Sequence, residues 1–242
     1  MGNNHPAPSP WSVRHPLSPD QVSLDTAPPG CGMLPIPLGV GRPCADRVTP
    51  AGPRGPGADS IHMTQEFVVL VDEQNTILGT MSKGEVHRAR TPLHRAFSSF
   101  IFRASDKQLL LQQRSAKKRT WPLMWSNSCC GHPGLGESNL DAARRRLKYE
   151  LGLEPTLLEE VAPYRYCFTK DGVMENETCP ILVGTVEHEP VINPDEVEAV
   201  RWMEWRAFLE ELERNPKQYS EWCIEEVRIL EKTPRCKELI GL

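Results

Sequence analysis

The chain has 242 residues, of which 25% are charged, and its formal net charge is −4 at pH 7. A mildly acidic chain is not expected to bind nucleic acid or an anionic membrane through its overall charge, so an anionic ligand needs a local cluster of basic side chains. No apolar run approaches about 18 residues, and the chain does not begin with a basic and then apolar stretch, so neither a transmembrane helix nor a secretory signal is expected.

The composition changes sharply near residue 62. Residues 1–62 hold 13 of the 23 prolines and 8 of the 17 glycines, together with four arginines and four aspartates. Such a segment buries too little apolar surface to offset the entropy lost on ordering. We therefore predict a disordered extension over residues 1–62 and one folded domain over residues 63–242. Strand-like sequence directly follows Met63, which leaves open that translation starts there; a transit peptide is the weaker alternative.

The eight cysteines are unevenly spaced, and two of them, Cys129 and Cys130, are adjacent. Adjacent cysteines rarely pair with each other. In a chain without an export signal we expect reduced thiols and a cytoplasmic location.

The first predicted elements are strands. Apolar runs separated by a turn predict a hairpin over residues 66–83, and a polar loop is expected to follow up to Pro92. Aromatic-rich alternation predicts one strand over residues 94–102, and another follows over residues 108–114. A basic loop comes next, at residues 114–119.

Residues 139–151 form the clearest predicted helix. Its predicted buried stripe consists of apolar residues at helical spacing, namely Leu140, Ala143, Leu147 and Leu151. Ser138 or Asn139 is suited to cap the start, and Gly152 to end the helix.

The remaining sequence alternates between strands and helices. We predict β structure over residues 157–169 and 178–187, a turn at residues 170–172, a short strand over residues 200–205, and amphipathic helices over residues 207–214 and 220–232. This order predicts an α/β (α+β) fold, in which a mixed β-sheet sandwich is flanked by helices.

Histidines and carboxylates indicate a metal site. His87 and His94 flank one polar segment, and His132 follows the cysteine pair. Glu175 and Glu177 are one residue apart, so in a strand their side chains share a face. Three imidazoles and two carboxylates suit a five- or six-coordinate divalent metal, for which a transition metal is favoured. Separate surface histidines and a solvated acidic pair are the alternative.

The segment around the predicted helix carries further candidates. Glu137 and Glu150 suit a hard divalent cation near a diphosphate, and an ordinary charged helix face is the alternative. The Cys130 thiol, near an imidazole and basic residues, is expected to have a lowered pKa and to act as nucleophile or base. A buried apolar cysteine is the alternative, and it suits Cys129. An anion clamp is expected from four basic residues, Lys83, Arg114, Lys118 and Arg146, unless they are merely solvated.

These residues resemble a known family. Gly131, Glu137 and the run over residues 145–153 resemble the Nudix box, whose glutamates bind metals and activate water for diphosphate hydrolysis. Arg146 and Tyr149 replace two of those glutamates, which argues against hydrolysis. With the preceding sequence WSNSCCGHP, this degenerate box is similar to the type 1 isopentenyl-diphosphate delta-isomerases. The match continues at residues 87–98, 175–180 and 220–222, and covers about residues 65–230.

The resemblance implies isomerisation of isopentenyl diphosphate to dimethylallyl diphosphate through a tertiary carbocation, in isoprenoid biosynthesis. Cys130 and Glu177 would be the catalytic pair on opposite faces of the double bond, with the acid and the base left open. Tyr166 would hydrogen-bond near Glu177, and Trp222 would cover the hydrocarbon end. The substrate would be a small allylic or homoallylic diphosphate, with no nucleic-acid or membrane partner, bound by a monomer or a homodimer.

The resemblance also implies two metal ions. One divalent metal, Mn²⁺, Zn²⁺ or Mg²⁺, would be held by His87, His94, His132, Glu175 and Glu177. Glu150 and the Cys130 backbone carbonyl would help to place a Mg²⁺ that bridges to the diphosphate. The diphosphate itself would be gripped by the basic side chains Lys83, Arg114, Lys118 and Arg146.

Two other functions stay open at this point. A Nudix hydrolase would need the missing glutamates and would leave Cys130 without a role. A non-enzymatic metal-binding or interaction module would not need Lys83, Arg114 and Trp222 around one cavity.

Overall fold

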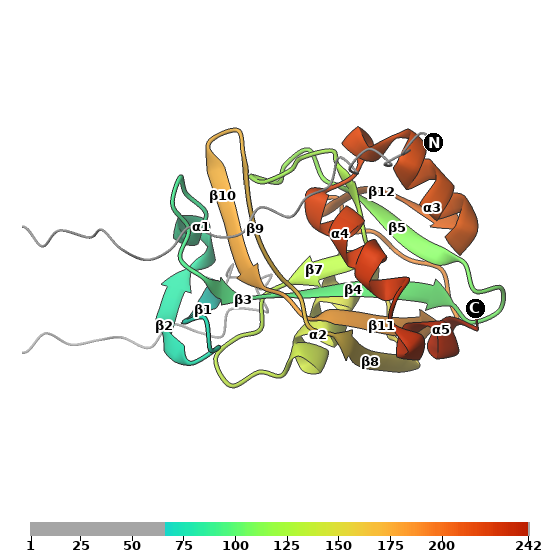
Figure 1. Cartoon of the computed structure of the whole chain (residues 1–242), viewed down its shortest axis with the longest axis horizontal. Helices are drawn as coiled ribbons and strands as arrows, with labels where there is room; N and C mark the ends of the chain where they lie inside the picture. Colours follow the sequence, from blue (N-terminus) through green and yellow to red (C-terminus); the bar gives the residue numbers. More distant parts are fainter. Residues whose placement is uncertain (1–65, 242) are drawn as a thin grey trace, which may run out of the picture. The chain divides into compact units, whose positions relative to one another are not determined.

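The computed structural model describes residues 66–241, which contain two β-sheets (Figure 1). The first sheet has five strands, in the order β2 (Ile77–Ser82), β1 (Phe67–Val71), β3 (His94–Arg95), β10 (Val173–Thr178) and β9 (Arg165–Lys170). The predicted disorder of residues 1–62 and the predicted boundary after them lie outside the described residues.

The second sheet has seven strands. Five of them follow the order β12 (Val197–Met203), β5 (Leu109–Arg114), β4 (Phe97–Arg103), β11 (Ile181–Val186) and β8 (Leu157–Ala162). The short strands pair with two of these, β6 (Trp125–Ser126) with β5 and β7 (Cys129–Gly131) with β4. The helices are α1 (Lys83–Val86), α2 (Asn139–Leu151), α3 (Trp205–Arg214), α4 (Glu221–Leu230) and α5 (Pro234–Ile240), with a 3₁₀ turn at Pro216–Gln218.

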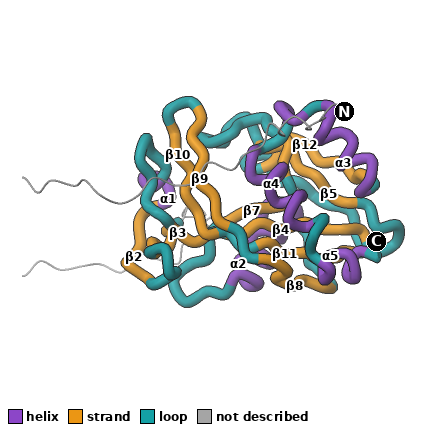
Figure 2. The backbone as a smooth tube through the Cα atoms, in the orientation of Figure 1, coloured by secondary structure: helices purple, strands orange, loops and turns teal. Residues whose placement is uncertain are grey.

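The core lies on both faces of the seven-stranded sheet. Strands β4 and β11 run parallel and are buried almost throughout, as expected for strands that are covered on both sides. Phe97 and Ile101 pack with the apolar side chains of α2, whereas Phe100 and Phe102 pack with those of α3, α4 and α5. Figure 2 shows α2 and α4 on either side of β4 and β11. Alternate residues of one strand therefore reach different layers.

The helix predicted over residues 139–151 is confirmed as α2. The Ser138 hydroxyl accepts a hydrogen bond from the Asp141 backbone N–H at 3.1 Å, and Gly152 ends the helix in the left-handed region with φ of 64°. The predicted stripe is wrong at Leu140, which is 36% exposed because it lies in the first turn and faces outward. The buried face also contains two charged residues, Arg146 and Glu150.

The expectation of one strand over residues 94–102 is wrong. The chain changes sheet at Ala96, whose backbone N–H donates to the Thr178 carbonyl. Before it, β3 lies between β1 and β10 in the smaller sheet; after it, β4 runs through the core of the larger one. The segment after β2, expected to be a polar loop, also differs. It begins with the short helix α1, which His87 caps at its C-terminal end. Strands β6 and β7 and helix α5 were not predicted, and β10 was missed as well, because the predicted β segments omitted residues 173–177.

The predicted turn at residues 170–172 is confirmed and sets the register of β9 against β10. Asp171 and Gly172 have φ of 50° and 78°, which fits the tight turns that join antiparallel strands. Tyr166 consequently lies directly opposite Glu177. No helix within residues 66–241 combines the length and apolar character needed to cross a membrane.

Candidate active site

A cavity of about 860 Å³ collects most of the predicted site residues. Its walls come from both sheets, from the loop after β5, and from α2 and α4. All predicted catalytic, metal and anion-binding residues line it except His94 and Glu150, which are buried, and Glu137, which is partly buried. The volume lies in the range of about 300–1,000 Å³ that is typical of small-molecule sites.

Three imidazoles and one carboxylate converge at this cavity. The ligand atoms of His87, His94, His132 and Glu177 all lie within 4.8 Å of one another. His94 of β3 is the register partner of Glu177 on β10, while His87 ends α1 and His132 follows β7. Glu177 Oε1 lies 3.0 Å from His132 Nε2 and 3.2 Å from His94 Nε2. Four segments distant in sequence thus meet at one carboxylate.

The chemistry of this cluster fits a divalent metal. Nε2 of His87 lies 2.8 Å from Oε2 of Glu175, and Nε2 of His94 lies 3.2 Å from Oε1 of Glu177. The geometry of neither contact is that of a hydrogen bond, so these two nitrogens and Oε2 of Glu175 are buried without a hydrogen bond among residues 66–241, although buried polar atoms are normally satisfied. The Pro92 carbonyl, 3.0 Å from His94 Nδ1, can only accept a hydrogen bond, so Nδ1 carries the proton and Nε2 offers a lone pair to the cluster. Imidazole nitrogens and carboxylate oxygens are the donors that such a metal prefers.

Electrostatics keeps the Glu177 carboxylate charged. Burial would raise its pKa, but the facing imidazoles of His132, His87 and His94 outweigh burial and hold the pKa well below its usual value. Burial lowers the pKa of His132 to about 3, although the nearby Glu177 carboxylate acts to raise it. Glu175 is the fifth predicted ligand, and its Oε2 lies 2.8 Å from His87 Nε2. The metal-binding role of these five residues stays a prediction.

The register of β7 gives the two adjacent cysteines different environments. Cys129 is paired with Ser99, is fully buried and packs with α2, whereas Cys130 is paired with Ser98 and lines the cavity. The Cys130 thiol donates to Asn127 Oδ1 at 3.2 Å, and its sulfur lies 3.4 Å from Ser98 Oγ.

The expectation of a lowered pKa for Cys130 is wrong in this structure. Burial first, and the nearby Glu226 second, raise the pKa of the Cys130 thiol to about 12, so the thiol keeps its proton. The sequence-based expectation considered basic neighbours and an imidazole, and it did not include the carboxyl group of α4.

Aromatic rings form another wall of the cavity. The Tyr166 hydroxyl donates to Glu177 Oε2 at 2.6 Å, and its ring stacks on Trp222 with centroids 5.9 Å apart. Trp121 meets Trp222 edge to face at 5.2 Å. Trp222 Nε1 donates to Ser126 Oγ at 3.1 Å, which fixes the orientation of the indole.

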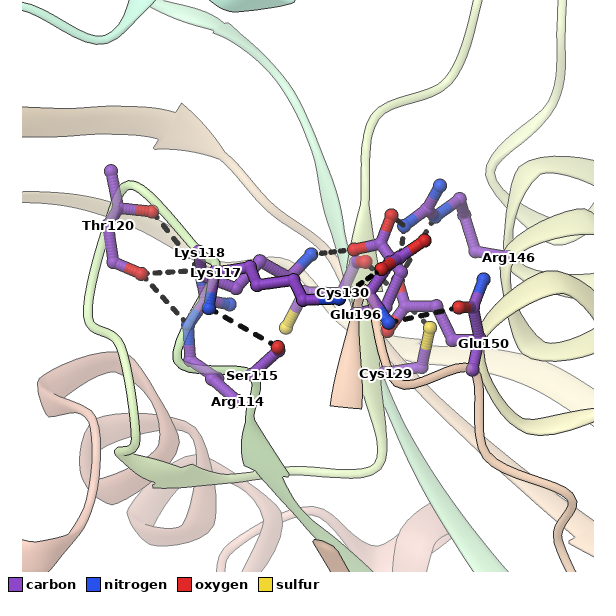
Figure 3. A network of polar contacts seen from close by, with 12 residues as sticks. Arg114, Ser115, Lys117, Lys118, Thr120, Cys129, Cys130, Arg146, Glu150 and Glu196 are labelled. Atoms are coloured by element: carbon purple, nitrogen blue, oxygen red, sulfur yellow. Dashed lines mark hydrogen bonds and ion pairs between the residues drawn. The ribbon is translucent and has the colours of Figure 1, made fainter. Parts of the chain in front are cut away.

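The four predicted anion-binding residues line the same cavity, and three of them are paired with carboxylates. Lys83 contacts Glu66 at 2.5 Å, and Lys118 contacts Glu196. Arg146 contacts Glu66 at 3.1 Å, Glu196 at 3.1 Å and Glu150 at 2.6 Å. Figure 3 shows Glu196 between Lys118 and Arg146.

Arg114 is held differently from the other three. It donates to the Thr120 carbonyl at 2.8 Å, and its guanidinium lies 5.5 Å from the centre of the Trp222 ring. The anion-binding side of the cavity thus adjoins its aromatic wall.

The family-model description "NUDIX domain" matches residues 92–223. A protein named isopentenyl-diphosphate Delta-isomerase from Escherichia coli O127:H6 (strain E2348/69 / EPEC) is 42% identical over 164 residues, 67% of this chain and 90% of that protein. A protein of the same name from Enterobacter sp. (strain 638) is 39% identical over 165 residues, 67% of this chain and 89% of that protein.

The chain belongs to the isopentenyl-diphosphate Delta-isomerase family, within the Nudix group. The solved structure of DR0079 from Deinococcus radiodurans shares the fold, with a TM-score of 0.52 at 20% identity over 67% of this chain and 98% of that one. These similarities confirm the predicted family and fold class.

In this member of the isomerase family, arginines hold the remaining glutamates of the Nudix box. Glu137 accepts hydrogen bonds from Arg145 at 2.8 and 2.7 Å, and Glu150 accepts two from Arg146 at 3.0 and 2.6 Å. Tyr149 is half-exposed, with the Arg146 guanidinium 5.0 Å from its ring centre. Glu150 is therefore buried behind Arg146 in this structure, and its role at a Mg²⁺ stays a prediction.

Sequence reasoning missed three polar residues of the isomerase site. Asn127 Oδ1 accepts hydrogen bonds from Ser126, Cys130 and Trp222, and Asn127 lies within the WSNSCCGHP stretch. Ser98 lies within the matched residues 87–98, but no function had been assigned to it. Glu196 had no sequence signal, because its partners are distant in sequence. Burial would raise its pKa, but Lys118 and Arg146 lower the pKa to about 2.

Proposed function

We propose that the chain isomerises isopentenyl diphosphate to dimethylallyl diphosphate, with Cys130 and Glu177 as the two proton-transfer groups. One observation supports this assignment. The Cys130 thiol, the Tyr166–Glu177 pair, an aromatic wall and four cationic side chains all line one cavity. A hydrolase would gain nothing from a thiol at this position. A metal-binding module would not need the cations and Trp222 around the same space.

The reaction adds one proton and removes one. A proton added to the terminal carbon of the double bond leaves a tertiary carbocation, and loss of a proton from the adjacent methylene forms the new double bond. Substrate and product therefore have the same composition. Cys130 handles one of these protons, and Glu177, hydrogen-bonded to the Tyr166 hydroxyl, handles the other.

The carbocation has to be protected from water, which would trap it as an alcohol. Trp222 is almost fully buried and Tyr166 stacks on it, so this wall is apolar and closed. An indole face stabilises a desolvated cation by about 0.5–2 kcal/mol. Four cationic side chains would hold the diphosphate and keep it in place while the hydrocarbon end reacts, namely Lys83, Arg114, Lys118 and Arg146.

Two metal ions complete the proposal. Mg²⁺ would accompany the diphosphate, with Glu150 and the Cys130 carbonyl as proposed ligands, and Mn²⁺, Zn²⁺ or Mg²⁺ would be held by His87, His94, His132, Glu175 and Glu177. When bound, these ions supply positive charge that fixes the Glu177 carboxylate and neutralises the diphosphate. We also propose a cytoplasmic location, which the six free cysteines of the described chain support.

One assay tests the function. The protein is loaded with Mn²⁺ or Zn²⁺, incubated with isopentenyl diphosphate and Mg²⁺, and analysed for dimethylallyl diphosphate by mass-resolved chromatography. Release of phosphate or pyrophosphate without isomer would favour a hydrolase. Metal-loaded protein that forms no isomer would overturn the proposal.

The indole of Trp222 is expected to act on turnover more than on binding. Trp222→Leu, which fills space without a π system, should lower kcat about tenfold relative to Trp222→Phe, because only the phenyl ring stabilises the cation. Both variants lose the hydrogen bond to Ser126, so that loss cancels in the comparison. Steady-state kinetics measures the difference; a change confined to KM would contradict cation stabilisation.

Glu66 is expected to compete with the substrate diphosphate for Lys83 and Arg146. Its half-exposed carboxylate contacts both cations, and ion pairs of this exposure are worth about 0–1 kcal/mol. Glu66→Gln should therefore lower KM by up to about fivefold at unchanged kcat. Glu73→Gln, at an exposed carboxylate paired with Arg165, is the matched control. A higher KM in Glu66→Gln would show that Glu66 organises the cations instead.

A further inference from the structure

Asn127 contacts both the proposed proton-transfer thiol and the aromatic wall, yet the proposed reaction gives it no role. It is fully buried and lies in the turn between β6 and β7. Its amide oxygen Oδ1 accepts three hydrogen bonds, from Ser126 Oγ at 2.8 Å, Cys130 Sγ at 3.2 Å and Trp222 Nε1 at 3.3 Å. The thiol and the indole of the proposed mechanism therefore meet at one atom.

The orientation of the Asn127 amide is fixed by groups that can act in only one way. Nδ2 lies 3.1 Å from the Ser99 carbonyl and 3.2 Å from the Cys129 carbonyl, and a carbonyl can only accept a hydrogen bond. The indole N–H of Trp222, on the other side, can only donate. Nδ2 therefore faces the two carbonyls and Oδ1 faces the indole, so the Cys130 thiol meets an acceptor and directs its proton there.

The neighbours of this amide do not depend on it for their hydrogen bonds. The two carbonyls also accept from the Ser128 backbone N–H at 3.0 Å and from Ser99 Oγ at 2.9 Å. The Cys130 sulfur also contacts Ser98 Oγ at 3.4 Å, and the indole also donates to Ser126 Oγ at 3.1 Å. Because each of these groups keeps a second partner, removing the amide leaves none of them buried and unpaired.

We propose that Asn127 is a positioning residue that holds the Cys130 thiol and the Trp222 indole in one fixed arrangement around the reacting carbons. The two groups act on the same carbocation, since one transfers a proton beside it and the other stabilises its charge. Their mutual placement therefore sets the rate, and a misplacement of about 1 Å can lower a rate about 10²-fold. Asn127 itself does not line the cavity, and the inference rests on the proposed isomerase function.

Asn127→Ala and Asn127→Asp test the proposal by steady-state kinetics with isopentenyl diphosphate. Alanine removes the shared acceptor, so kcat should fall about 10²-fold, while KM stays within about twofold because the amide contacts none of the diphosphate-binding cations. A buried aspartic acid that faces two carbonyls stays protonated, so it donates to a carbonyl and still accepts from the thiol and the indole. Asn127→Asp should therefore keep kcat about tenfold above that of Asn127→Ala.

Ser128→Ala is the matched control for these variants. Ser128 is also fully buried, but its hydroxyl donates to the Leu110 carbonyl at 2.6 Å and accepts from the Ile101 N–H at 2.7 Å, away from the thiol and the indole. Its loss should lower the melting temperature at least as much as Asn127→Ala does and leave kcat unchanged. Equal losses of kcat in Ser128→Ala and Asn127→Ala would show that destabilisation accounts for the effect.

A double-mutant cycle with Trp222→Phe completes the test. Asn127→Ala should lower kcat less in the Trp222→Phe background than in the unmodified protein, because the phenyl ring has no N–H to place. Equal losses in the two backgrounds would overturn the inference, as would equal kcat in Asn127→Ala and Asn127→Asp or a kcat of Asn127→Ala within about threefold of the unmodified protein. An Asn127→Ala variant that does not fold would also overturn it, because the amide would then be needed for the fold.

The same experiments separate this inference from the proposed function. If the unmodified protein forms no dimethylallyl diphosphate, the proposed function fails, and the inference fails with it. If the unmodified protein is active and any of the contradicting results is found, the function stands and only the role of Asn127 is overturned.

Discussion

Cys130→Ala is expected to lower kcat for isomerisation by about 10³-fold or more while the fold stays intact. The thiol is the proposed proton-transfer group on one side of the substrate, and such groups contribute about 10²–10⁴-fold. Removing it breaks the sulfur's contacts with Asn127 and Ser98 and some apolar packing at the cavity wall. Product formation measures the loss of activity, and circular dichroism with thermal melting checks the fold.

Cys129→Ala is the matched control for this experiment. Cys129 packs against α2 on the other face of the sheet, so its loss should destabilise the protein by about 1–2 kcal/mol and spare kcat. An inactive Cys129→Ala beside an active Cys130→Ala would mean that the assignment of the two thiols to opposite faces of β7 is wrong.

Glu177→Gln is expected to have an effect of similar size and to lower metal content as well. Oε1 of Glu177 faces three imidazoles and Oε2 accepts the Tyr166 hydroxyl, so an amide removes the charge from a proposed metal ligand and from the proposed proton-transfer pair together. We expect kcat to fall by about 10³-fold or more. Elemental analysis of the purified variant should find bound divalent metal well below that of the unmodified protein.

Glu175→Gln provides the comparison for Glu177→Gln. Glu175 shares the inward face of β10 and contacts His87, but it makes no hydrogen bond to Tyr166. Its substitution should weaken metal binding and lower kcat less than the change at Glu177. Equal losses of kcat in the two variants would indicate that Glu177 acts only as a metal ligand and that another group moves the proton.

Features that depend on local sequence could be predicted without the structure. Helix α2 follows from apolar spacing with Ser138 and Gly152 at its ends, and the β9–β10 turn follows from Asp171 and Gly172. The shared face of Glu175 and Glu177 follows from the two-residue period of a strand. The family resemblance brought the distant histidines together, which spacing alone could not do.

Features that depend on distant partners could not be predicted in this way. At the strand break, the Ala96 backbone N–H donates to Thr178, which is far along the chain. No local sequence signal marks the break between β3 and β4. The protonated state of Cys130 depends first on burial of the thiol and second on Glu226, which lies far along the chain on α4. Leu140 lies in the first turn of α2 and is 36% exposed, although its spacing places it in the apolar stripe.

The change of sheet at Ala96 has a mechanical consequence. His94 of the metal cluster and Ser98 beside the Cys130 sulfur are joined by four residue steps of extended chain, which span at most about 14 Å. A covalent tether therefore limits how far the two sheets can separate at this point. The tether limits in particular how far His94 can move from Ser98 and the Cys130 sulfur beside it.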